Sequence, residues 1–456
     1  MKRREFIRLN AAGTFLSAAA SWSVQAEDAK APGEVVREAA RDIPVAARAD
    51  VVVCGAGPAG VCAALAAARK GARTLLLEAH GSLGGIWTTG LLSYFLDFSN
   101  KPGIMREIVE RATKLDGRAF SKKGAGTNAF DPEIIKIVLE DLCGEAGVQV
   151  QYHSRVCAAV KHTGGRLTHV ITESKSGREA VQGGIFVDCT GDGDVAAQAG
   201  CQFDLGNPET GALQPMSLIA LVTGIVTDEI QEYFRDSDSA EWAKPKDALN
   251  AEMTRGGRSP SYAKPSLFRV REGLFILMSN HEYGVKGTNV REVTQATLRA
   301  RRELHDQING LRSLGGPWKN IRLVATPAQI GVREGRRIHG LYTVVADDLR
   351  EGRNQPDAVC TVTFPVDVHA TNPNKEKGIE KSSFRTKPYE IPLRALIAKD
   401  VTGLMMAGRC ISGDFIAHSS YRVTGNAAAM GEAAGKTAAL AAKSDRLPQN
   451  VKITEL

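Results

Sequence analysis

The feature that most constrains this chain is a run of glycines between an apolar strand and an Ala-rich helix. The Val-rich segment Ala49–Cys54 predicts a buried parallel strand. It leads into Gly55-Ala56-Gly57-Pro58-Ala59-Gly60, and a helix is predicted over Val61–Lys70, ended by Gly71. A second strand is predicted over Arg73–Leu77. This strand–turn–helix–strand setting is the one in which G-x-G-x-x-G binds a dinucleotide.

Each motif residue has a physical role. Gly55 permits the tight turn, and Gly57 has no side chain, so a diphosphate can approach the backbone there. Gly60 allows the helix to pack closely on the strand, and the helix N-terminus offers N–H donors and a positive dipole end. A carboxylate after the second strand accepts hydrogen bonds from ribose hydroxyls and disfavours a 2′-phosphate. The predicted dinucleotide-binding residues are Gly55, Gly57, Pro58, Ala59, Gly60 and Glu78.

Three further glycine-containing segments favour FAD over NAD. A second glycine pair, Gly84-Gly85, follows Glu78, where a nicotinamide-binding domain would usually continue into a helix. An apolar strand over Ile185–Cys189 ends in Thr190-Gly191-Asp192. A strand over Gly403–Ala407 is followed by Gly408-Arg409 and, after a loop, by a small-residue helix start. That helix start comprises Gly425-Asn426-Ala427-Ala428-Ala429-Met430-Gly431-Glu432-Ala433-Ala434-Gly435.

With these motifs, the chain resembles the bacterial FAD-dependent oxidoreductase family, within the glutathione-reductase-like flavoprotein superfamily. The resemblance runs from about residue 48 to 443, and most of its motifs are short and glycine-rich. It is carried by the motifs above and by Gly331-Val332-Arg333-Glu334-Gly335-Arg336-Arg337-Ile338, Tyr389-Glu390-Ile391-Pro392-Leu393-Arg394-Ala395-Leu396, Leu404-Met405-Met406-Ala407-Gly408-Arg409 and Arg422-Val423. It implies a Rossmann-like fold with non-covalently bound FAD.

The resemblance also implies roles for single residues. Glu78 would hold the adenosine ribose, and the flavin ring would lie by the helix start at Gly425-Asn426. The residues implied to lie along the rest of the cofactor are Gly84, Gly85, Thr190, Gly191, Asp192, Gly408 and Arg409. Many relatives carry Gly-Asp where this chain has Gly408-Arg409, which puts the ribityl contact in doubt and makes Asp414 a candidate substitute.

The expected fold class is α/β, a Rossmann-like FAD-binding domain with an inserted β-meander and a second, α+β substrate domain. Strands split by Gly164-Gly165 and Ser176-Gly177 predict the meander over 148–182, and helices are predicted over 103–116, 131–146 and 290–314. The expected divisions are a signal peptide (1–26), an arm (27–45), the first part of the FAD domain (46–202), the substrate domain (203–384), the FAD return segment (385–446) and a tail (447–456).

The N-terminus reads as an export signal. Arg3-Arg4 stands before the apolar stretch Ala11–Ala20, and Val24-Gln25-Ala26 fits a cleavage site. The pattern resembles the twin-arginine signal, whose machinery exports folded proteins and therefore suits a chain that binds its cofactor in the cytoplasm. We expect a periplasmic protein that is soluble or peripherally associated with the membrane.

Charge and cysteine content exclude several classes of function. The formal net charge is +7, with no Lys/Arg-rich run that interleaves aromatic residues, so nucleic-acid binding is not supported. The eight cysteines show no C-x-x-C and no metal-type spacing, so neither a metal site nor disulfide-reductase chemistry is expected. The chain has a single G-x-G-x-x-G, which argues against a built-in NAD(P)H domain.

The catalytic candidates are basic residues in the second half of the chain. His418 and Arg422 flank the last helix start; His418 is a candidate acid or base. Arg333 and Arg336, with Glu334 and Arg337, form either an anion clamp in the cleft or a salt-bridge network between domains. His369 and His281 are weaker candidates, and His80 has the wrong spacing for covalent flavin attachment.

The expected function is dehydrogenation of a small organic substrate, sugar-derived or hydroxylated, by hydride transfer to flavin. An exported enzyme lacks a free nicotinamide pool, so a quinone, a cytochrome or oxygen would have to accept the electrons. Three alternatives stay open at this point: a reductase of activated C=C bonds, a redox-inactive FAD-loaded binding protein, and a non-redox isomerase.

Overall fold

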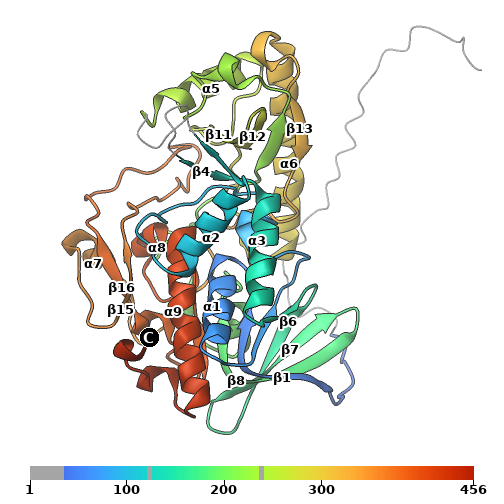
Figure 1. Ribbon diagram of the computed structural model, residues 1–456. Helices are drawn as coiled ribbons and strands as arrows, with labels where there is room; N and C mark the ends of the chain where they lie inside the picture. Colours follow the sequence, from blue (N-terminus) through green and yellow to red (C-terminus); the bar gives the residue numbers. More distant parts are fainter. Residues whose placement is uncertain (1–34, 121–125, 236–240) are drawn as a thin grey trace, which may run out of the picture. The chain divides into compact units, whose positions relative to one another are not determined.

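The computed structural model describes residues 35–120, 126–235 and 241–456 (Figure 1). The predicted signal peptide (1–26) and the first part of the predicted arm (27–34) lie outside the described residues. Residues 35–42 contain no helix or strand and belong to a separate unit, whereas Ile43–Leu456 form one compact unit. The helices, the strands and the candidate site all belong to this second unit.

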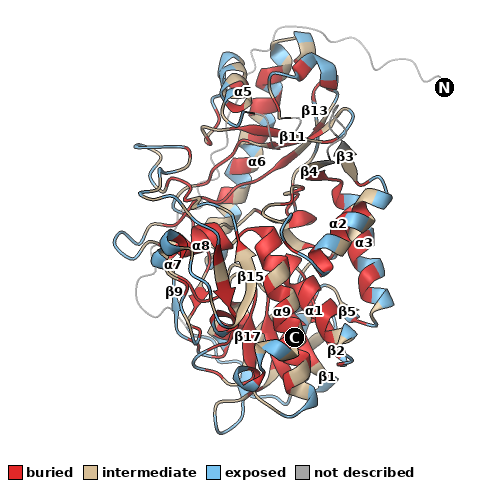
Figure 2. Ribbon diagram, turned by 60° about the vertical axis from the view of Figure 1, so that its left-hand side comes forward, coloured by how far each residue is buried: buried red, intermediate tan, exposed pale blue. Residues whose placement is uncertain are grey.

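A parallel sheet forms the centre of the nucleotide-binding part. Its strands lie in the order β5 (Gln149–Gln151), β2 (Thr74–Leu77), β1 (Val45–Cys54), β8 (Gly177–Asp188) and β17 (Leu404–Met406), and each neighbouring pair is parallel. All of β2 and β17 and the last four residues of β1 and of β8 are buried (red in Figure 2). The α/β fold with a Rossmann-like parallel sheet is therefore confirmed.

The predicted meander is present, but its strands divide differently. Strand β6 (Arg155–Lys161) pairs with β7 (Leu167–Ser174), and β7 pairs with the first half of β8. The single strand expected over 148–161 is two strands, because β5 ends at Gln151 and joins the parallel sheet. Two strands expected over 178–182 and 185–189 are one continuous strand, β8, whose second half pairs with β17.

The long helices α1 (Pro58–Arg69) and α9 (Thr424–Lys443) pack side by side against the parallel strands (Figures 1 and 2). The contact requires glycine on α9. A Cβ on Gly431 would lie 2.0 Å from the carbonyl oxygen of Ala59, and one on Gly435 would lie 2.0 Å from that of Ala63. These two glycines therefore allow α9 to approach the backbone of α1 closely.

We expect Gly435→Val to lower the free energy of unfolding by about 2–4 kcal/mol, because a side chain there forces α9 away from α1. Urea unfolding followed by circular dichroism measures the change. Lys436→Ala is the matched control on the next residue; it removes only a partly exposed ion pair with Glu432 and should cost less than about 1 kcal/mol. Equal losses in the two variants would contradict the packing account.

Two predicted helices cover the sheet beside α1. They are α2 (Ile104–Lys114) and α3 (Pro132–Glu145), and both are confirmed. Asp131 caps α3 as expected, since its Oδ1 accepts a hydrogen bond from the backbone N–H of Glu133 at 2.9 Å. Between the two helices, the short strands β3 (Arg118–Phe120) and β4 (Gly126–Phe130) pair antiparallel.

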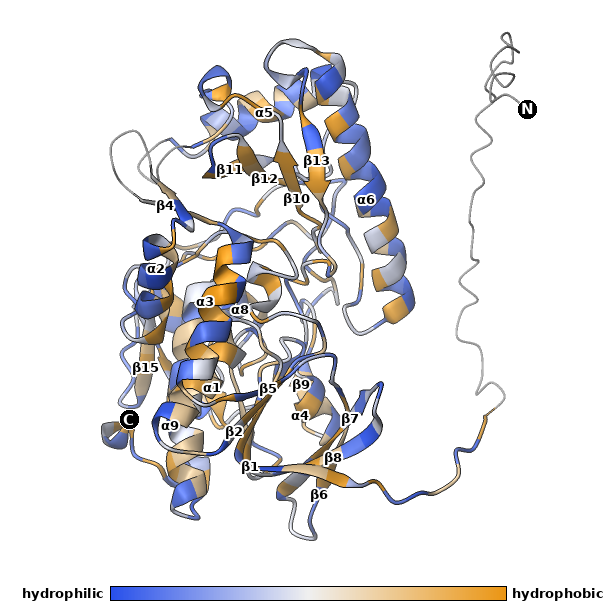
Figure 3. Ribbon diagram, turned by 45° about the vertical axis from the view of Figure 1, so that its right-hand side comes forward, coloured by the Kyte–Doolittle hydropathy of each residue, from blue (hydrophilic) through white to orange (hydrophobic). Residues whose placement is uncertain are grey.

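A second, four-stranded antiparallel sheet carries its own core. Its order is β11-β12-β10-β13, and two helices pack around it. The predicted long helix is confirmed as α6; its buried residues Ala296, Ala300, Leu304 and Ile308 recur every four positions, and Figure 3 shows the resulting alternation of polar and apolar colour. The elements are β10 (Ala220–Thr223), α5 (Lys244–Arg255), β11 (Ser266–Arg271), β12 (Leu274–Met278), α6 (Val290–Ser313) and β13 (Arg322–Ala325).

Shorter elements connect the two sheets. Strand β9 pairs with β14 and β15 with β16, and Ile338, Val344 and Val362 belong to the core of the nucleotide-binding part. The chain thus packs against the first core again before residue 385. The elements are α4 (Asp194–Gln198), β9 (Phe203–Asp204), β14 (Arg337–Ile338), α7 (Ala346–Glu351), β15 (Ala358–Val362), β16 (Tyr389–Pro392) and α8 (Phe415–Tyr421).

All eight cysteines are free, and six of them are buried. Burial raises the pKa of the Cys54 and Cys62 thiols well above its ordinary value, so these side chains behave as small apolar groups. Within the described ranges, no helix is both long enough and apolar enough to span a bilayer, and no cluster of His, Cys, Asp or Glu side chains suits a metal ion.

Candidate active site

A cavity of about 220 Å³ lies where β1, β2 and β8 end, at the start of α1. This is the carboxyl edge of a parallel sheet, where α/β folds bind nucleotides. Most of the predicted cofactor residues line this first cavity: Gly55, Gly57, Pro58, Ala59, Glu78, Gly85, Thr190, Gly191, Asp192, Gly408 and Arg409.

The three motif glycines have the environments that their predicted roles require. Gly55 has a φ of +93°, and a Cβ there would lie 2.5 Å from the carbonyl oxygen of Cys189. A Cβ on Gly60 would lie 1.8 Å from the carbonyl oxygen of Gly55. At Gly57, in contrast, a Cβ would meet nothing within 4 Å. Gly55 and Gly60 thus leave no room for a side chain. Of the three glycines, only Gly57 has open space over it; it lies at the N-terminus of α1, where an anion is favoured.

The Glu78 carboxylate lies at the end of β2 and lines the same cavity. Its Oε2 accepts a hydrogen bond from the backbone N–H of Ala56 at 2.7 Å, and its Oε1 accepts one from that of His80 at 2.8 Å. These two bonds fix the carboxylate, and each oxygen has a further lone pair for a hydroxyl donor. The walls next to it include Ser154 and Arg155, from the start of the meander.

The Asp188–Asp194 loop forms another wall and is held by Asp188. The buried Asp188 carboxylate accepts hydrogen bonds from the backbone and hydroxyl of Thr190 and from the backbone N–H of Ala196. Burial raises the pKa of Asp188 to about 6. Asp192 in turn pairs with Arg409, whose Nη2 lies 2.8 Å from Asp192 Oδ1.

The residues present fit a flavin dinucleotide. The first cavity is smaller than the roughly 300–1,000 Å³ of typical small-molecule sites, so a dinucleotide bound there must continue beyond it. Among the described residues, the Thr424 hydroxyl and the Asn426 amide are buried and lack hydrogen-bond partners. Both are in the first turn of α9, and Thr424 lines both this cavity and its neighbour. Buried polar atoms without partners are rare and point to an absent ligand.

A second cavity, of about 430 Å³, adjoins the first. The two share lining residues Ile86, Val332, Arg409, Arg422 and Thr424. Most of the second cavity's walls are apolar or aromatic, including Tyr94, Phe95, Ile219, Phe268 and Ile379. Its charged lining residues are Asp97, Arg235, Lys246, Arg333, Asp367, Arg409 and Arg422. Cations therefore outnumber carboxylates on this surface.

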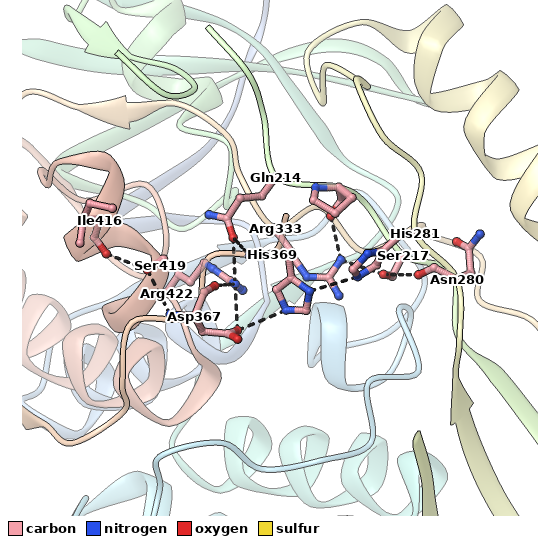
Figure 4. A network of polar contacts seen from close by, with 11 residues as sticks. Gln214, Ser217, Asn280, His281, Arg333, Asp367, His369, Ile416, Ser419 and Arg422 are labelled. Carbon is pink, nitrogen blue, oxygen red and sulfur yellow. Dashed lines mark hydrogen bonds and ion pairs between the residues drawn. The ribbon is translucent and has the colours of Figure 1, made fainter. Parts of the chain in front are cut away.

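A polar network lies on one wall of the second cavity (Figure 4). Oδ2 of Asp367 lies 3.2 Å from Nη2 of Arg422 and 3.3 Å from Nε2 of His369. Oδ1 of Asp367 has no hydrogen-bond partner among the described residues. Gln214 Oε1 accepts hydrogen bonds from the backbone of His369 and from Arg422. Arg333 donates from Nη1 to the Pro215 carbonyl and to Ser217 Oγ, both at 2.7 Å.

Two buried histidines extend this network away from the cavity. Nδ1 of His369 lies 3.1 Å from Nε2 of His281, and Nδ1 of His281 lies 3.1 Å from the Tyr283 hydroxyl. Burial and the nearby Arg333 lower the pKa of His369 to about 4, and the same causes lower that of His281 still further. The pKa of Asp367 is held well below its usual range by His369, Arg422 and Arg333, which outweigh its burial. At neutral pH the carboxylate is ionised and both imidazoles are neutral.

These shifts predict a pH-dependent stability. His369 is neutral when folded and has a pKa near 6.5 when unfolded, so its contribution is complete above pH 6.5 and is lost as pH falls toward 4. Between pH 7.5 and 5 we expect the advantage of the wild-type protein over His369→Gln in unfolding free energy to shrink by on the order of 2 kcal/mol.

Urea unfolding of both proteins at several pH values measures this difference. The two proteins are compared at each pH because Asp188 also makes the unfolding free energy depend on pH, in the opposite direction to His369. Asp188 is present in both proteins, so its contribution drops out of the difference. Met278→Leu, at a residue that does not titrate, is the control and should show a constant difference from wild type. A constant difference for His369→Gln as well would refute a neutral His369.

The arginine cluster predicted at 333–337 divides between two surroundings. Arg333 lines the second cavity. Arg336 lines neither cavity and bonds to the Asp192 carbonyl and to Asp194, both at 2.9 Å. Arg337 pairs with Glu334 at 2.7 Å in a fully buried ion pair. The sequence left open an anion clamp in the cleft or a salt-bridge network. The position of Arg333 on the cavity wall fits the clamp, and the ion pairs of Arg336 and Arg337 fit the network.

Several other candidates lie outside both cavities. His418 is fully buried, and burial lowers its pKa well below the ordinary value. Asp414 caps α8 and also accepts from the backbone N–H of Ala346. A Cβ on Gly425 would meet the carbonyl oxygens of Leu96 and Asp97 within 2.5 Å, so this glycine serves a backbone contact. Gly60, Gly84 and Asn426 stand behind the cavity walls rather than in them.

Sequence reasoning missed Gln214, Lys246 and Asp367. They come from segments about 30 to 150 residues apart, in stretches without a glycine motif, and the tertiary fold brings them to the second cavity and its polar network. The available signal was Asp367, which stands two residues before His369 in an apolar run, a spacing that places both side chains on one face of an extended segment.

No curated protein matches this chain. Among solved structures, it is similar to a geranylgeranyl bacteriochlorophyll reductase-like protein from Thermoplasma acidophilum, at 14% identity and a TM-score of 0.44, covering 87% of this chain and 78% of that one. It is also similar to the p-nitrophenol 4-monooxygenase PnpA from Pseudomonas putida DLL-E4, at 11% identity and a TM-score of 0.45, covering 88% and 82%. A flavin-dependent brominase, Bmp2, matches at 13% identity and a TM-score of 0.44, covering 89% and 81%.

The family model described as FAD dependent oxidoreductase matches residues 50–456, nearly the whole of the described chain. The match contains the glycine turn, Glu78 and both cavities. The chain belongs to the family of FAD-dependent oxidoreductases and uses FAD as its cofactor.

Proposed function

We propose that this oxidoreductase is an exported dehydrogenase that oxidises a small hydroxylated or sugar-derived compound. The observation that carries the proposal is the second cavity. It shares walls with the FAD cavity and is lined by Arg333, Arg422 and Asp367, whose Oδ1 has no hydrogen-bond partner within the described part of the chain. A base beside cations is the combination that removal of a hydroxyl proton requires.

Bound FAD supplies the hydride acceptor for the carbon that is oxidised. The chain itself handles the proton. The substrate hydroxyl donates to Oδ1 of Asp367, while Arg422 and His369 hold Oδ2 in place. Arg333, whose pKa burial lowers only to about 10, stays protonated and stabilises the developing alkoxide, so a weakly basic carboxylate suffices.

The apolar walls exclude water from this step. Phe95, Ile219, Phe268 and Ile379 line the cavity around the charged groups. In such surroundings the attraction between an arginine and a developing oxyanion is much stronger than in water. These walls also favour a substrate with an apolar part next to the hydroxylated carbon.

A C=C reductase is the second candidate, and Arg333 is the observation that favours it. Arg333 and Arg422 would bind a carboxylate that polarises the double bond. The same cavity without turnover would serve a FAD-loaded binding protein.

Export and electron transfer are parts of the proposal that rest on sequence alone. Arg3-Arg4 and the following apolar stretch support passage through the twin-arginine machinery to the periplasm. A quinone, a cytochrome or oxygen would then reoxidise the flavin. Placement in the glutathione-reductase-like superfamily rests on the short glycine-rich motifs of the sequence.

Anaerobic mixing tests the proposal. The purified flavoprotein is screened against hydroxylated compounds, and loss of the flavin absorbance near the visible maximum is recorded. Bleaching by a hydroxylated compound is the expected result. Reoxidation of pre-reduced flavin by an unsaturated acid, without bleaching by any alcohol, would support the reductase instead. Tight ligand binding without either change would support the binding protein.

A further inference from the structure

Lys246 is a buried lysine on the wall of the second cavity. Lys246 is only 7% exposed and lines the cavity, yet among the described residues its ammonium forms no ion pair or hydrogen bond. Its one described partner is the ring of Trp242, whose centroid lies 3.9 Å from Nζ. Lysine is almost never fully buried without a partner, so this arrangement requires an explanation.

The position of Lys246 on its helix adds to the cost. It lies in the first turn of α5, where the helix dipole favours an anion and disfavours a cation. Arg235 and Lys264 repel it further. Three unfavourable conditions therefore meet at one ammonium: burial, the helix N-terminus and neighbouring cations.

Two described carboxylates attract Lys246, and neither forms an ion pair with it. Asp247 is exposed and binds Lys264 at 2.6 Å. Asp367 also attracts Lys246, but its Oδ2 contacts Arg422 and His369. The cavity thus presents a positive site, built from a helix N-terminus and a buried ammonium, with which no carboxylate of the described residues pairs.

We propose that Lys246 anchors an anionic group of the substrate, so that the enzyme acts on hydroxylated organic anions rather than on neutral alcohols. An anion there would receive a charge-assisted hydrogen bond from Nζ and would be favoured by the N-terminus of α5. The inference rests on the proposed function in taking the second cavity as the substrate site.

The protonation of Lys246 makes the proposal measurable, because anion binding there must be accompanied by proton uptake. Burial, with Arg235 nearby, lowers the pKa of Lys246 to about 7, so the amine is half protonated at neutral pH. An anion bound to Nζ raises this pKa, and the protein must then take up about half a proton per anion at pH 7. A merely structural lysine would show no such uptake.

The experiment titrates the FAD-loaded protein with benzoate, with phenyl phosphate and with neutral benzyl alcohol. Calorimetry at pH 7 in two buffers of different ionisation enthalpy gives both affinity and proton uptake. We expect at least one anion to bind more tightly than benzyl alcohol and with proton uptake; comparison of the two anions decides between a carboxylate and a phosphate group. Anion binding no tighter than that of benzyl alcohol, or without proton uptake, would overturn the proposal.

Two variants at this position sharpen the test. Lys246→Met should weaken anion binding by at least about tenfold and abolish proton uptake. Lys246→Arg should keep the affinity within a few-fold but lose the uptake, because arginine is always protonated. Lys244→Met, on an exposed lysine of the same helix, is the control and should change neither quantity. Unchanged uptake in Lys246→Arg would assign the proton to another group and refute the anchor.

Failure of the anchor and failure of the proposed function give different results. If Lys246 binds anions as described but no hydroxylated compound bleaches the flavin, the anchor stands and the dehydrogenase falls. If the bleaching compounds are neutral, and Lys246→Met leaves their affinity unchanged, the dehydrogenase stands and the anchor falls.

Discussion

Gly57→Asp will give a folded protein that has lost its affinity for FAD by at least about a hundredfold. Gly57 has ordinary extended backbone angles, and a Cβ there would meet no atom within 4 Å, so the backbone can accept a side chain without strain. It is also the N-cap of α1, a position that aspartate favours. The new carboxylate would occupy the space over the helix N-terminus and repel a diphosphate by about 3 kcal/mol or more.

The measurement is FAD affinity by fluorescence quenching, with circular dichroism to confirm folding. Gly57→Asn separates size from charge and should lose less affinity than the aspartate variant. Gly144→Ala, at a glycine of α3 that also has open space around it, should bind FAD as the wild type does. Full FAD content in Gly57→Asp would mean that the diphosphate lies elsewhere.

Asp367→Asn should slow anaerobic flavin reduction by about 10²–10⁴-fold while FAD stays bound. Asparagine keeps the shape of the side chain but cannot accept the substrate's proton. It also weakens the hold of Arg422 and His369, both of which contact Oδ2. Stopped-flow absorbance, with a substrate found in the bleaching screen, measures the rate constant.

Met278→Leu is the control for this experiment, because Met278 lines the same cavity and has no acid–base capacity. It should change the rate by only a few-fold. A loss in Asp367→Asn that resides entirely in substrate affinity, with an unchanged limiting rate of flavin reduction, would make Asp367 a binding group rather than the base.

The nucleotide-binding half could be predicted because its determinants are local. Gly55, Gly57 and Gly60 act within one turn, and each has the environment that its place in the motif implies. The same holds for Asp131, which caps the helix that it directly precedes. Where local patterns were ambiguous, the tertiary fold decided. Gly431 and Gly435, four residues apart, are equally suited to a cofactor or to a second helix, and they contact α1.

The second cavity could not be predicted, because its charged residues have no common sequence signature. Arg333, Arg336 and Arg337 are near neighbours in the chain, yet Arg333 lines the cavity while the other two form salt bridges away from it. Nothing in the sequence distinguishes Lys246, which is buried, from Lys244, which is exposed. Their difference arises from which face of α5 packs against the second sheet.

The most direct test of the whole account is the cofactor content of the purified protein that begins after residue 26. We predict a yellow protein that releases about one intact FAD per chain on denaturation, bound without a covalent link. A colourless protein that does not take up FAD even at saturating concentration, although circular dichroism shows it folded, would contradict the assignment of the first cavity to the dinucleotide.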